Sequence, residues 1–151
     1  MPKPPPADSR FWKLFEVLTT VNTKLFRATD GRIGGGLGKM KILLLHHVGR
    51  KSGKERVSPL LYLRDGDRLV IVASKGGSEK HPAWFHNLMA NPDTLVELPR
   101  EKRSVRARQA TDEERADLWP RLVDIYSPYE SYQTYTDRKI PLVILEHAAP
   151  Q

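Results

Sequence analysis

The sequence predicts a mainly β, α+β fold: a small antiparallel barrel of about six strands with helices at its periphery. The first observation is a series of short apolar runs of strand length after residue 40, most of them separated by turn-forming residues. The second is that apolar residues at helical spacing are confined to a few other stretches. The chain has 151 residues, so one domain with a sizeable core is the default.

The composition limits the classes of function. The chain has no cysteine, which excludes disulfides, thiolate catalysis and cysteine-based zinc or iron–sulfur sites. No apolar run is long enough to span a bilayer, and residues 1–10 lack the apolar core of a secretory signal, so we expect a cytoplasmic protein. The formal net charge of +7 favours anionic partners: nucleic acid, an anionic membrane surface or a phosphorylated small ligand.

Three segments are expected before the barrel domain, which we place at residues 41–148. Residues 1–8 are proline-rich and predict a disordered tail. Residues 9–28 combine apolar side chains at helical spacing with lysine and arginine, and they predict an amphipathic helix. Such a helix could lie in a membrane interface, although packing on the domain or on a partner chain produces the same pattern more often. Residues 29–40 are glycine-rich without periodicity and predict a flexible linker.

The expected strands are linked mainly by hairpins. They are, in chain order, residues 41–48, 56–63, 69–72, 94–98, 104–110 and 141–146. Turns at residues 49–53 and 64–67 join the first three strands, and the second turn carries a strong Asp-Gly signal. Pro59 in the second strand indicates an edge or a bulge, because proline cannot donate a ladder hydrogen bond.

Two helices are expected among these strands. Pro82 fits the first position of a short helix that stops before Asn91. Thr111 begins a second helix, and Glu114 three residues later completes a capping box. Pro120 falls inside this second helix and should kink it or divide it into two pieces.

Basic residues gather in two segments that hairpin geometry brings together. Arg50 and Lys51 lie in the first turn, Arg56 lies on the next strand, and Lys75 lies in a glycine-bearing loop at residues 74–77. If the first three strands pair as neighbours, the turn and the loop meet at one end of the sheet. There they could hold a phosphate-bearing ligand by charge-assisted hydrogen bonds, aided by the N-terminus of the following helix. The alternative is a solvated turn and an ordinary joint between a strand and a helix.

Two further clusters bear on chemistry. Tyrosines recur at every third residue from Tyr126 to Tyr135, and they could either wall a pocket for a planar ring or form a packed aromatic cluster. His46 and His47 are adjacent on a strand and point to opposite faces, so they cannot bind one metal ion together. The sequence has no zinc-site spacing and no serine-hydrolase motif, and we expect no bound metal.

Three motifs together resemble those of the deazaflavin-dependent nitroreductase family. They are G-R-K-S-G at residues 49–53, S-K-G-G-S-E-K-H-P-A-W at residues 74–84 and Y-E-S-Y-Q-T-Y-T-D-R-K-I-P at residues 129–141. The resemblance extends over about residues 43–146, in order and without large gaps. It implies a split β-barrel of the flavin-reductase or FMN-binding type and the deazaflavin coenzyme F(420), which has a phosphodiester and an acidic tail. The implied activity is hydride transfer from the reduced coenzyme to a menaquinone-like quinone or a nitroaromatic acceptor.

The resemblance also implies roles for individual residues. Those that would hold the phosphate and acidic tail are Arg50, Lys51 and Arg56. Those that would contact or enclose the deazaflavin are Ser74, Lys75, Gly76, Gly77, Trp84 and Asn87. Those nearest the transfer chemistry would be Ser74, Tyr126, Tyr129 and, closest of all, Tyr132. Members often have two tyrosines where this chain has Leu61 and Tyr62, and the less polar wall favours a quinone over a nitro compound.

Other readings of the sequence remain open at this point. A relative on the same barrel that binds flavin or haem, as a carrier or storage protein, would share most of these features. A nucleic-acid-binding module fits the charge, but the aromatic residues cluster apart from most of the basic ones, so we expect no nucleic-acid partner. A lipid-dissolved quinone would give the helix at residues 9–28 a use at the inner face of the cell membrane. Both a monomer and a homodimer are compatible with the sequence.

Overall fold

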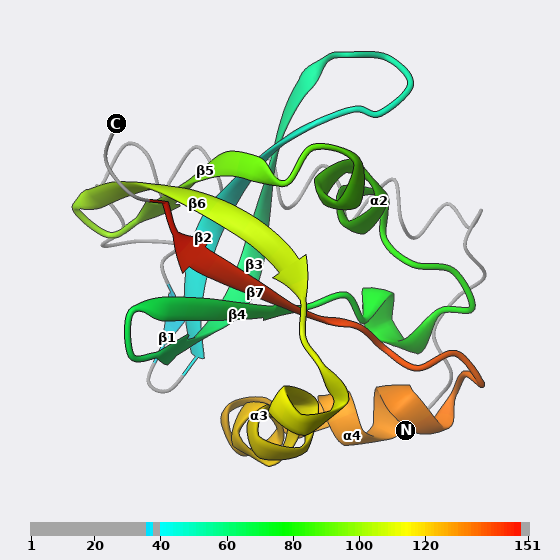
Figure 1. The fold of residues 1–151 in the computed structure, drawn as a ribbon. Helices are drawn as coiled ribbons and strands as arrows, with labels where there is room; N and C mark the ends of the chain where they lie inside the picture. The colour runs from blue at the N-terminus through cyan, green and yellow to red at the C-terminus, as the bar shows by residue number, and fades with distance from the viewer. Residues whose placement is uncertain (1–35, 38–39, 149–151) are drawn as a thin grey trace.

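Figure 1 shows a closed antiparallel barrel with helices on its outside. The computed structural model describes residues 36–37 and 40–148. The strands are β1 (Gly36–Leu37), β2 (Met40–Val48), β3 (Glu55–Asp65), β4 (Arg68–Val72), β5 (Asp93–Leu98), β6 (Glu101–Gln109) and β7 (Leu142–His147). Their order is β1-β2-β3-β4-β7-β6-β5, and a further pairing between β2 and β5 closes a barrel of six strands, as predicted.

The segments expected before the barrel fall largely outside the described residues. This applies to the tail at residues 1–8 and to the helix at residues 9–28. Part of the linker expected at residues 29–40 is described, and there the structure differs from the prediction: Gly36–Leu37 pair with the start of β2. Backbone hydrogen bonding to a strand edge needs no side-chain periodicity, so the sequence pattern gives no sign of it.

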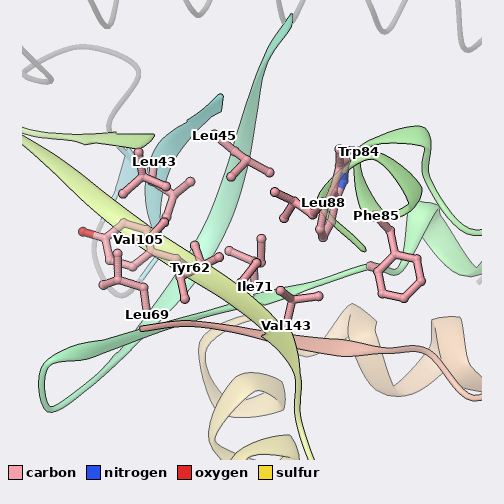
Figure 2. Close-up of a cluster of buried hydrophobic side chains, with 14 of the residues drawn as sticks. Leu43, Leu45, Tyr62, Leu69, Ile71, Trp84, Phe85, Leu88, Val105 and Val143 are labelled. Atoms are coloured by element: carbon pink, nitrogen blue, oxygen red, sulfur yellow. The ribbon is translucent and has the colours of Figure 1, made fainter. Parts of the chain in front are cut away.

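The interior of the barrel is one apolar cluster to which β2 through β7 all contribute. Figure 2 shows its members, among them Leu43, Leu45, Tyr62, Leu69, Ile71, Val105 and Val143. The short helix α2 (Ala83–Ala90) adds Trp84, Phe85 and Leu88 to the same cluster. Alternation along each strand sends every second side chain into this interior.

A second apolar cluster lies on the outer face of β4 and β7. It is covered by α3 (Asp112–Ile125) and α4 (Pro128–Thr134), which lie together on one side of the barrel in Figure 1. Val70 and Val72 point toward these helices, whereas Leu69 and Ile71 point into the barrel. Burial on both faces explains why this strand is apolar at every position from Leu69 to Val72.

The N-terminus of α3 is fixed by its capping box and by ion pairs. The Thr111 hydroxyl accepts from the Glu114 backbone N–H, and the Glu114 carboxylate accepts from the Thr111 backbone N–H. Arg108 donates to both Glu114 carboxylate oxygens, at 2.7 and 2.8 Å, and Arg68 donates to one of them at 2.9 Å. The bonds from Arg108 and from the Thr111 amide hold the pKa of the Glu114 carboxyl far below its usual range.

Two prolines show how position decides the effect of proline. Of the kink or division predicted at Pro120, the division does not occur, since α3 continues from Asp112 to Ile125. It lies on an exposed part of the helix, where water can satisfy the freed carbonyl group. Pro59 lies opposite Leu44 of β2, in a part of β3 that β4 does not reach, so the predicted edge position is confirmed. Among the described residues, no helix is long and apolar enough to cross a membrane.

Candidate functional site

A cationic pocket lies where the turn after β2 meets the loop after β4. Its volume is about 470 Å³, and the residues that line it are Arg50, Lys75, Glu79, Lys80, His81, Ala83, His86 and Asn87. Arg50 comes from the turn and Lys75 from the short 3-10 helix η1 (Lys75–Gly77). The antiparallel pairing of β2, β3 and β4 therefore brings the two basic segments together, as hairpin geometry predicts.

The turn at residues 49–54 is a tight hairpin connection. The Gly49 N–H donates to the Lys54 carbonyl at 2.9 Å, and the Gly53 N–H donates to the Gly49 carbonyl at 2.8 Å. Gly53 has φ +70°, a value that favours glycine. Lys51 and Arg56 are exposed at this hairpin and do not appear among the described residues that line the pocket.

A chain of side-chain hydrogen bonds reaches this turn from the barrel. Asn87 on α2 accepts from the Arg50 backbone N–H through Oδ1 at 3.0 Å, and its Nδ2 lies 2.9 Å from His47 Nδ1. His47 Nε2 in turn lies 2.9 Å from Ser58 Oγ. Burial, with help from Arg56 and His46, lowers the pKa of His47 to about 4.

The glycine-bearing loop is held differently. Arg138, which follows α4, donates to the backbone carbonyls of Ala73, Ser74 and Ser78, at 3.1, 2.7 and 2.8 Å. A fourth bond joins its guanidinium to His81 Nδ1 at 2.9 Å. One arginine side chain therefore fixes the path of the chain from the end of β4 to the start of α2.

Gly77 serves close packing within the protein. A Cβ atom at this position would come within 2.6 Å of the Tyr132 carbonyl oxygen and 2.9 Å of the Tyr132 Cα. The Gly77 N–H donates to the Ser74 carbonyl at 2.9 Å, and φ is +81°. This glycine lets the loop touch the backbone of α4, and the contact joins the loop to the tyrosine cluster.

The tyrosines form one cluster around α4. Tyr129 and Tyr132 lie within the helix, while Tyr126 is the C-cap residue of α3 and Tyr135 is the C-cap residue of α4. The hydroxyls of Tyr126 and Tyr132 are 2.8 Å apart and hydrogen-bonded. Burial raises the pKa of both Tyr129 and Tyr132, so both phenols keep their protons at neutral pH. Leu61, like Tyr126 and Tyr132, packs against the second apolar cluster, and its neighbour Tyr62 points into the barrel.

The structure groups some of the predicted site residues and separates others. Arg50, Lys75 and Asn87 share the pocket, whereas Trp84 is buried in the barrel core with 7% of its surface exposed. Sequence reasoning missed Arg138 and His47. Arg138 stands inside the third motif, and inward alternation with Leu43 and Leu45 could have indicated that His47 is buried.

Comparison with known proteins identifies the family. The F420H(2)-dependent quinone reductase family matches residues 18–147. The chain is a member of this family. A relative in Mycobacterium tuberculosis whose name gives the same activity is 47% identical over 115 residues, which cover 76% of this chain and 97% of the relative. An F420H(2)-dependent quinone reductase of the same species is 40% identical over 132 residues, covering 85% of this chain and 89% of the relative.

Solved structures agree with this assignment. A structure described as an F420-H2 dependent reductase has a TM-score of 0.65 and 42% identity, and it covers 70% of this chain and 93% of its own. A protein described as a domain-swapped dimer has a TM-score of 0.68 and 37% identity over 89% of this chain and 99% of its own. This quinone reductase family member is thus an oxidoreductase that transfers a hydride from the reduced deazaflavin coenzyme to a quinone.

More distant structures show the fold alone. HutZ, the haem storage protein of Vibrio cholerae, has a TM-score of 0.53 but only 13% identity, over 87% of this chain and 92% of its own. The predicted split β-barrel is confirmed by these neighbours together with the closed strand order.

Proposed function

We propose that the cationic pocket holds the phosphate and acidic tail of coenzyme F(420), and that the tyrosine cluster faces a menaquinone-like acceptor. The single observation that supports this most strongly is that Arg50 and Lys75, from two separate segments, line one pocket of about 470 Å³. Guanidinium and ammonium groups are the donors that a phosphodiester and carboxylates require. This donor set fits the anionic part of the coenzyme.

Lys51 and Arg56 would extend the same site along the hairpin. Both side chains are exposed next to the pocket, so they can follow a flexible acidic tail. Arg56 lies opposite His47 in the register of β2 and β3, on the strand that follows the turn containing Arg50. Together these cations would bind the acidic groups of the tail along the hairpin.

The protein's part in the chemistry would be to position the reactants and to supply a hydrogen-bond donor. When bound, the reduced coenzyme supplies the hydride. Ser74 and Lys75 would lie along the ring system, next to the contact between Gly77 and Tyr132. In the Tyr126–Tyr132 pair one hydroxyl donates to the other, and the accepting phenol keeps its own hydrogen. That hydrogen would bond the acceptor oxygen and stabilise negative charge there.

The acceptor class follows from the wall beside the tyrosines. Leu61 packs on the same cluster as Tyr126 and Tyr132, and it offers no polar group to a nitro substituent. An apolar wall suits a quinone with a hydrocarbon chain. We therefore place quinones ahead of nitroaromatic compounds as acceptors.

Anaerobic kinetics with the full chain, reduced coenzyme F(420) and a soluble menaquinone analogue test these roles. Tyr132→Phe should lower kcat with little change in coenzyme Kd. Lys51→Ala and Arg56→Ala should weaken coenzyme binding by about 1–3 kcal/mol each, as expected for a lost charged hydrogen bond. Lys102→Ala, an exposed change on β6, is the control. A larger effect of Tyr132→Phe on coenzyme Kd than on kcat would contradict the assignment.

Membrane contact is a separate part of the proposal. It rests on the basic, amphipathic sequence of residues 9–28 and on the solubility of menaquinones in lipid. Deletion of residues 1–28 should abolish binding to anionic liposomes and leave coenzyme affinity nearly unchanged. Unchanged liposome binding would contradict it.

A homodimer is also proposed, because the structure described as a domain-swapped dimer matches 89% of this chain. Sedimentation of the full chain tests it.

A further inference from the structure

A buried chain of polar side chains links the barrel to the cationic turn. It runs from Ser58 on β3 through His47 on β2 to Asn87 on α2, and it ends on the Arg50 backbone N–H. The three contacts measure 2.9, 2.9 and 3.0 Å. His47 and Asn87 are each only 5% exposed, in a region whose other buried residues are mainly apolar. Buried polar groups in such a place need partners, and here they partner one another.

The direction of every hydrogen bond in this chain is determined by its last member. A backbone N–H can only donate, so the atom of Asn87 that faces Arg50 is the carbonyl oxygen. The Asn87 amide nitrogen then donates to His47 Nδ1, which must carry no hydrogen. The hydrogen of His47 is therefore on Nε2, where it donates to Ser58 Oγ. A charged imidazolium carries a hydrogen on both ring nitrogens, so its Nδ1–H would point at the N–H of the Asn87 amide.

The surroundings of His47 keep it in this neutral form. Arg56 lies directly opposite on β3, and His46 is its neighbour on β2. Burial is the main reason why a second proton on the His47 ring is unfavourable. The positive charge of Arg56, and that of His46 when it is protonated, add to this effect. On α2, the group that hydrogen-bonds to His47 is the neutral amide of Asn87.

We propose that His47 is a positioning residue: through Asn87 it holds the Arg50 amide, and thereby the turn at residues 49–54, in its binding conformation before the coenzyme arrives. This rests on the proposed function, since that turn is the proposed phosphate site. A turn that is already ordered loses less conformational entropy when a ligand binds. Asn87 then acts on the coenzyme mainly through Arg50, because its carbonyl oxygen and its amide nitrogen are both already bonded within the protein.

Nitrogen NMR of the full chain without coenzyme tests the hydrogen-bond direction. The His47 ring should show a bare Nδ1 and a protonated Nε2 at neutral pH. The Arg50 amide, although its residue is exposed, should exchange slowly with solvent. A hydrogen on Nδ1, or an Arg50 amide that exchanges at the rate of an unstructured chain, would overturn the proposal.

Variants at position 47 separate positioning from general stability. His47→Asn keeps an oxygen near the place of Nδ1 and should preserve slow exchange at Arg50. His47→Leu should speed this exchange and raise the coenzyme KM, each by about tenfold, with kcat within about twofold, which is the loss of one hydrogen bond. His46→Leu, which loses the bond from His46 on β2 to Glu97 on β5, is the matched control. Equal effects of His46→Leu and His47→Leu would overturn the proposal.

Failure of this proposal can be told apart from failure of the proposed function. Ring protonation and amide exchange are measured without coenzyme, so they report only on the chain of hydrogen bonds from Ser58 to Arg50. If the exchange results are as expected but no variant changes coenzyme KM, these hydrogen bonds order a turn that does not bind the coenzyme, and the positioning role is refuted.

Discussion

The two cationic segments that share the pocket are held by different kinds of interaction. The turn at residues 49–54 is joined to α2 by the bond that the Arg50 N–H donates to Asn87, which in turn bonds to the neutral ring of His47. The loop at residues 74–78 is held by the charged guanidinium of Arg138 and by the packing of Gly77 against Tyr132. The turn is therefore held by neutral groups and is sensitive to protonation of His47, whereas the loop is held by a charged group and is joined to the tyrosine cluster. We infer that the acidic tail of the coenzyme meets the turn and that its ring system meets the loop.

The largest expected effect comes from filling the rigid contact. Gly77→Ala should destabilise the protein by about 2–4 kcal/mol, because the new Cβ would lie 2.6 Å from the Tyr132 oxygen and φ is +81°. The matched change in the turn is Gly53→Ala, where φ is +70° and nothing lies within 4 Å. It should cost only about 1 kcal/mol of backbone strain. Thermal unfolding measures both, at roughly 2–4 °C per kcal/mol. Equal losses would remove the distinction between a packed loop and an open turn.

The next effect concerns Arg138. Arg138→Met removes four hydrogen bonds and leaves carbonyls at Ala73, Ser74 and Ser78 to find other partners, so we expect a loss of about 2–3 kcal/mol in urea unfolding. Hydrogen exchange should quicken at residues 73–81 and stay unchanged at residues 49–54.

The control for Arg138 is Arg106→Met. Arg106 is exposed and forms an ion pair with the exposed Asp93, so its loss should change the free energy of unfolding by less than about 1 kcal/mol. Faster exchange in the turn as well as in the loop of Arg138→Met would show that the two segments are not held independently.

Acidification should weaken the structure around the turn through His47. Its pKa falls from 6.5 to about 4 on folding, so the unfolded chain binds more protons between these values. The free energy of unfolding then decreases as the pH drops from about 6.5 toward 4, by at most about 1.4 kcal/mol per pH unit. Above about pH 6.5 this contribution is complete. Urea unfolding over this range, compared with His47→Asn, isolates the effect from that of His81, whose pKa is also lowered, chiefly by burial. The same pH dependence in both proteins would contradict it.

The smallest expected effect on stability is that of Ser58, at the end of the hydrogen-bond chain farthest from the turn. Ser58→Ala removes the acceptor of His47 Nε2–H and should cost about 0.5–1.5 kcal/mol. Amide exchange should quicken at Arg50 but not at Gly77, whose N–H donates to Ser74 within the loop. If exchange at Gly77 changes as much as exchange at Arg50, Ser58 supports the whole end of the barrel and not the turn in particular.

Patterns with a simple period predicted much of the fold. The apolar runs at residues 69–72 and 141–146 became β4 and β7, and the Thr111–Glu114 capping box begins α3 as expected. Hairpin connectivity alone predicted that the turn and the loop meet. These features depend on local residue order, so they can be read without knowing the three-dimensional contacts.

Features that depend on distant contacts were missed or assigned another role. Gly77 appears in the sequence as a glycine for ligand approach, but its packing partner, Tyr132, is 55 positions further along the chain. Trp84 is expected at the wall of the coenzyme pocket, but it is not among the described residues that line the cationic pocket, and it packs in the barrel core. His47 and Arg138 act through bonds that span tens of residues, which no local motif records.

The most direct test of the central claim is a fluorescence titration of the full chain with oxidised coenzyme F(420), with FMN titrated alongside. We predict micromolar or tighter binding of the deazaflavin that weakens with added salt, because Arg50 and Lys75 line the pocket that would receive the acidic tail. FMN should bind much more weakly, since it lacks that tail. Absence of deazaflavin binding, or equal affinity for FMN, would contradict the assignment of the cationic pocket as the coenzyme site.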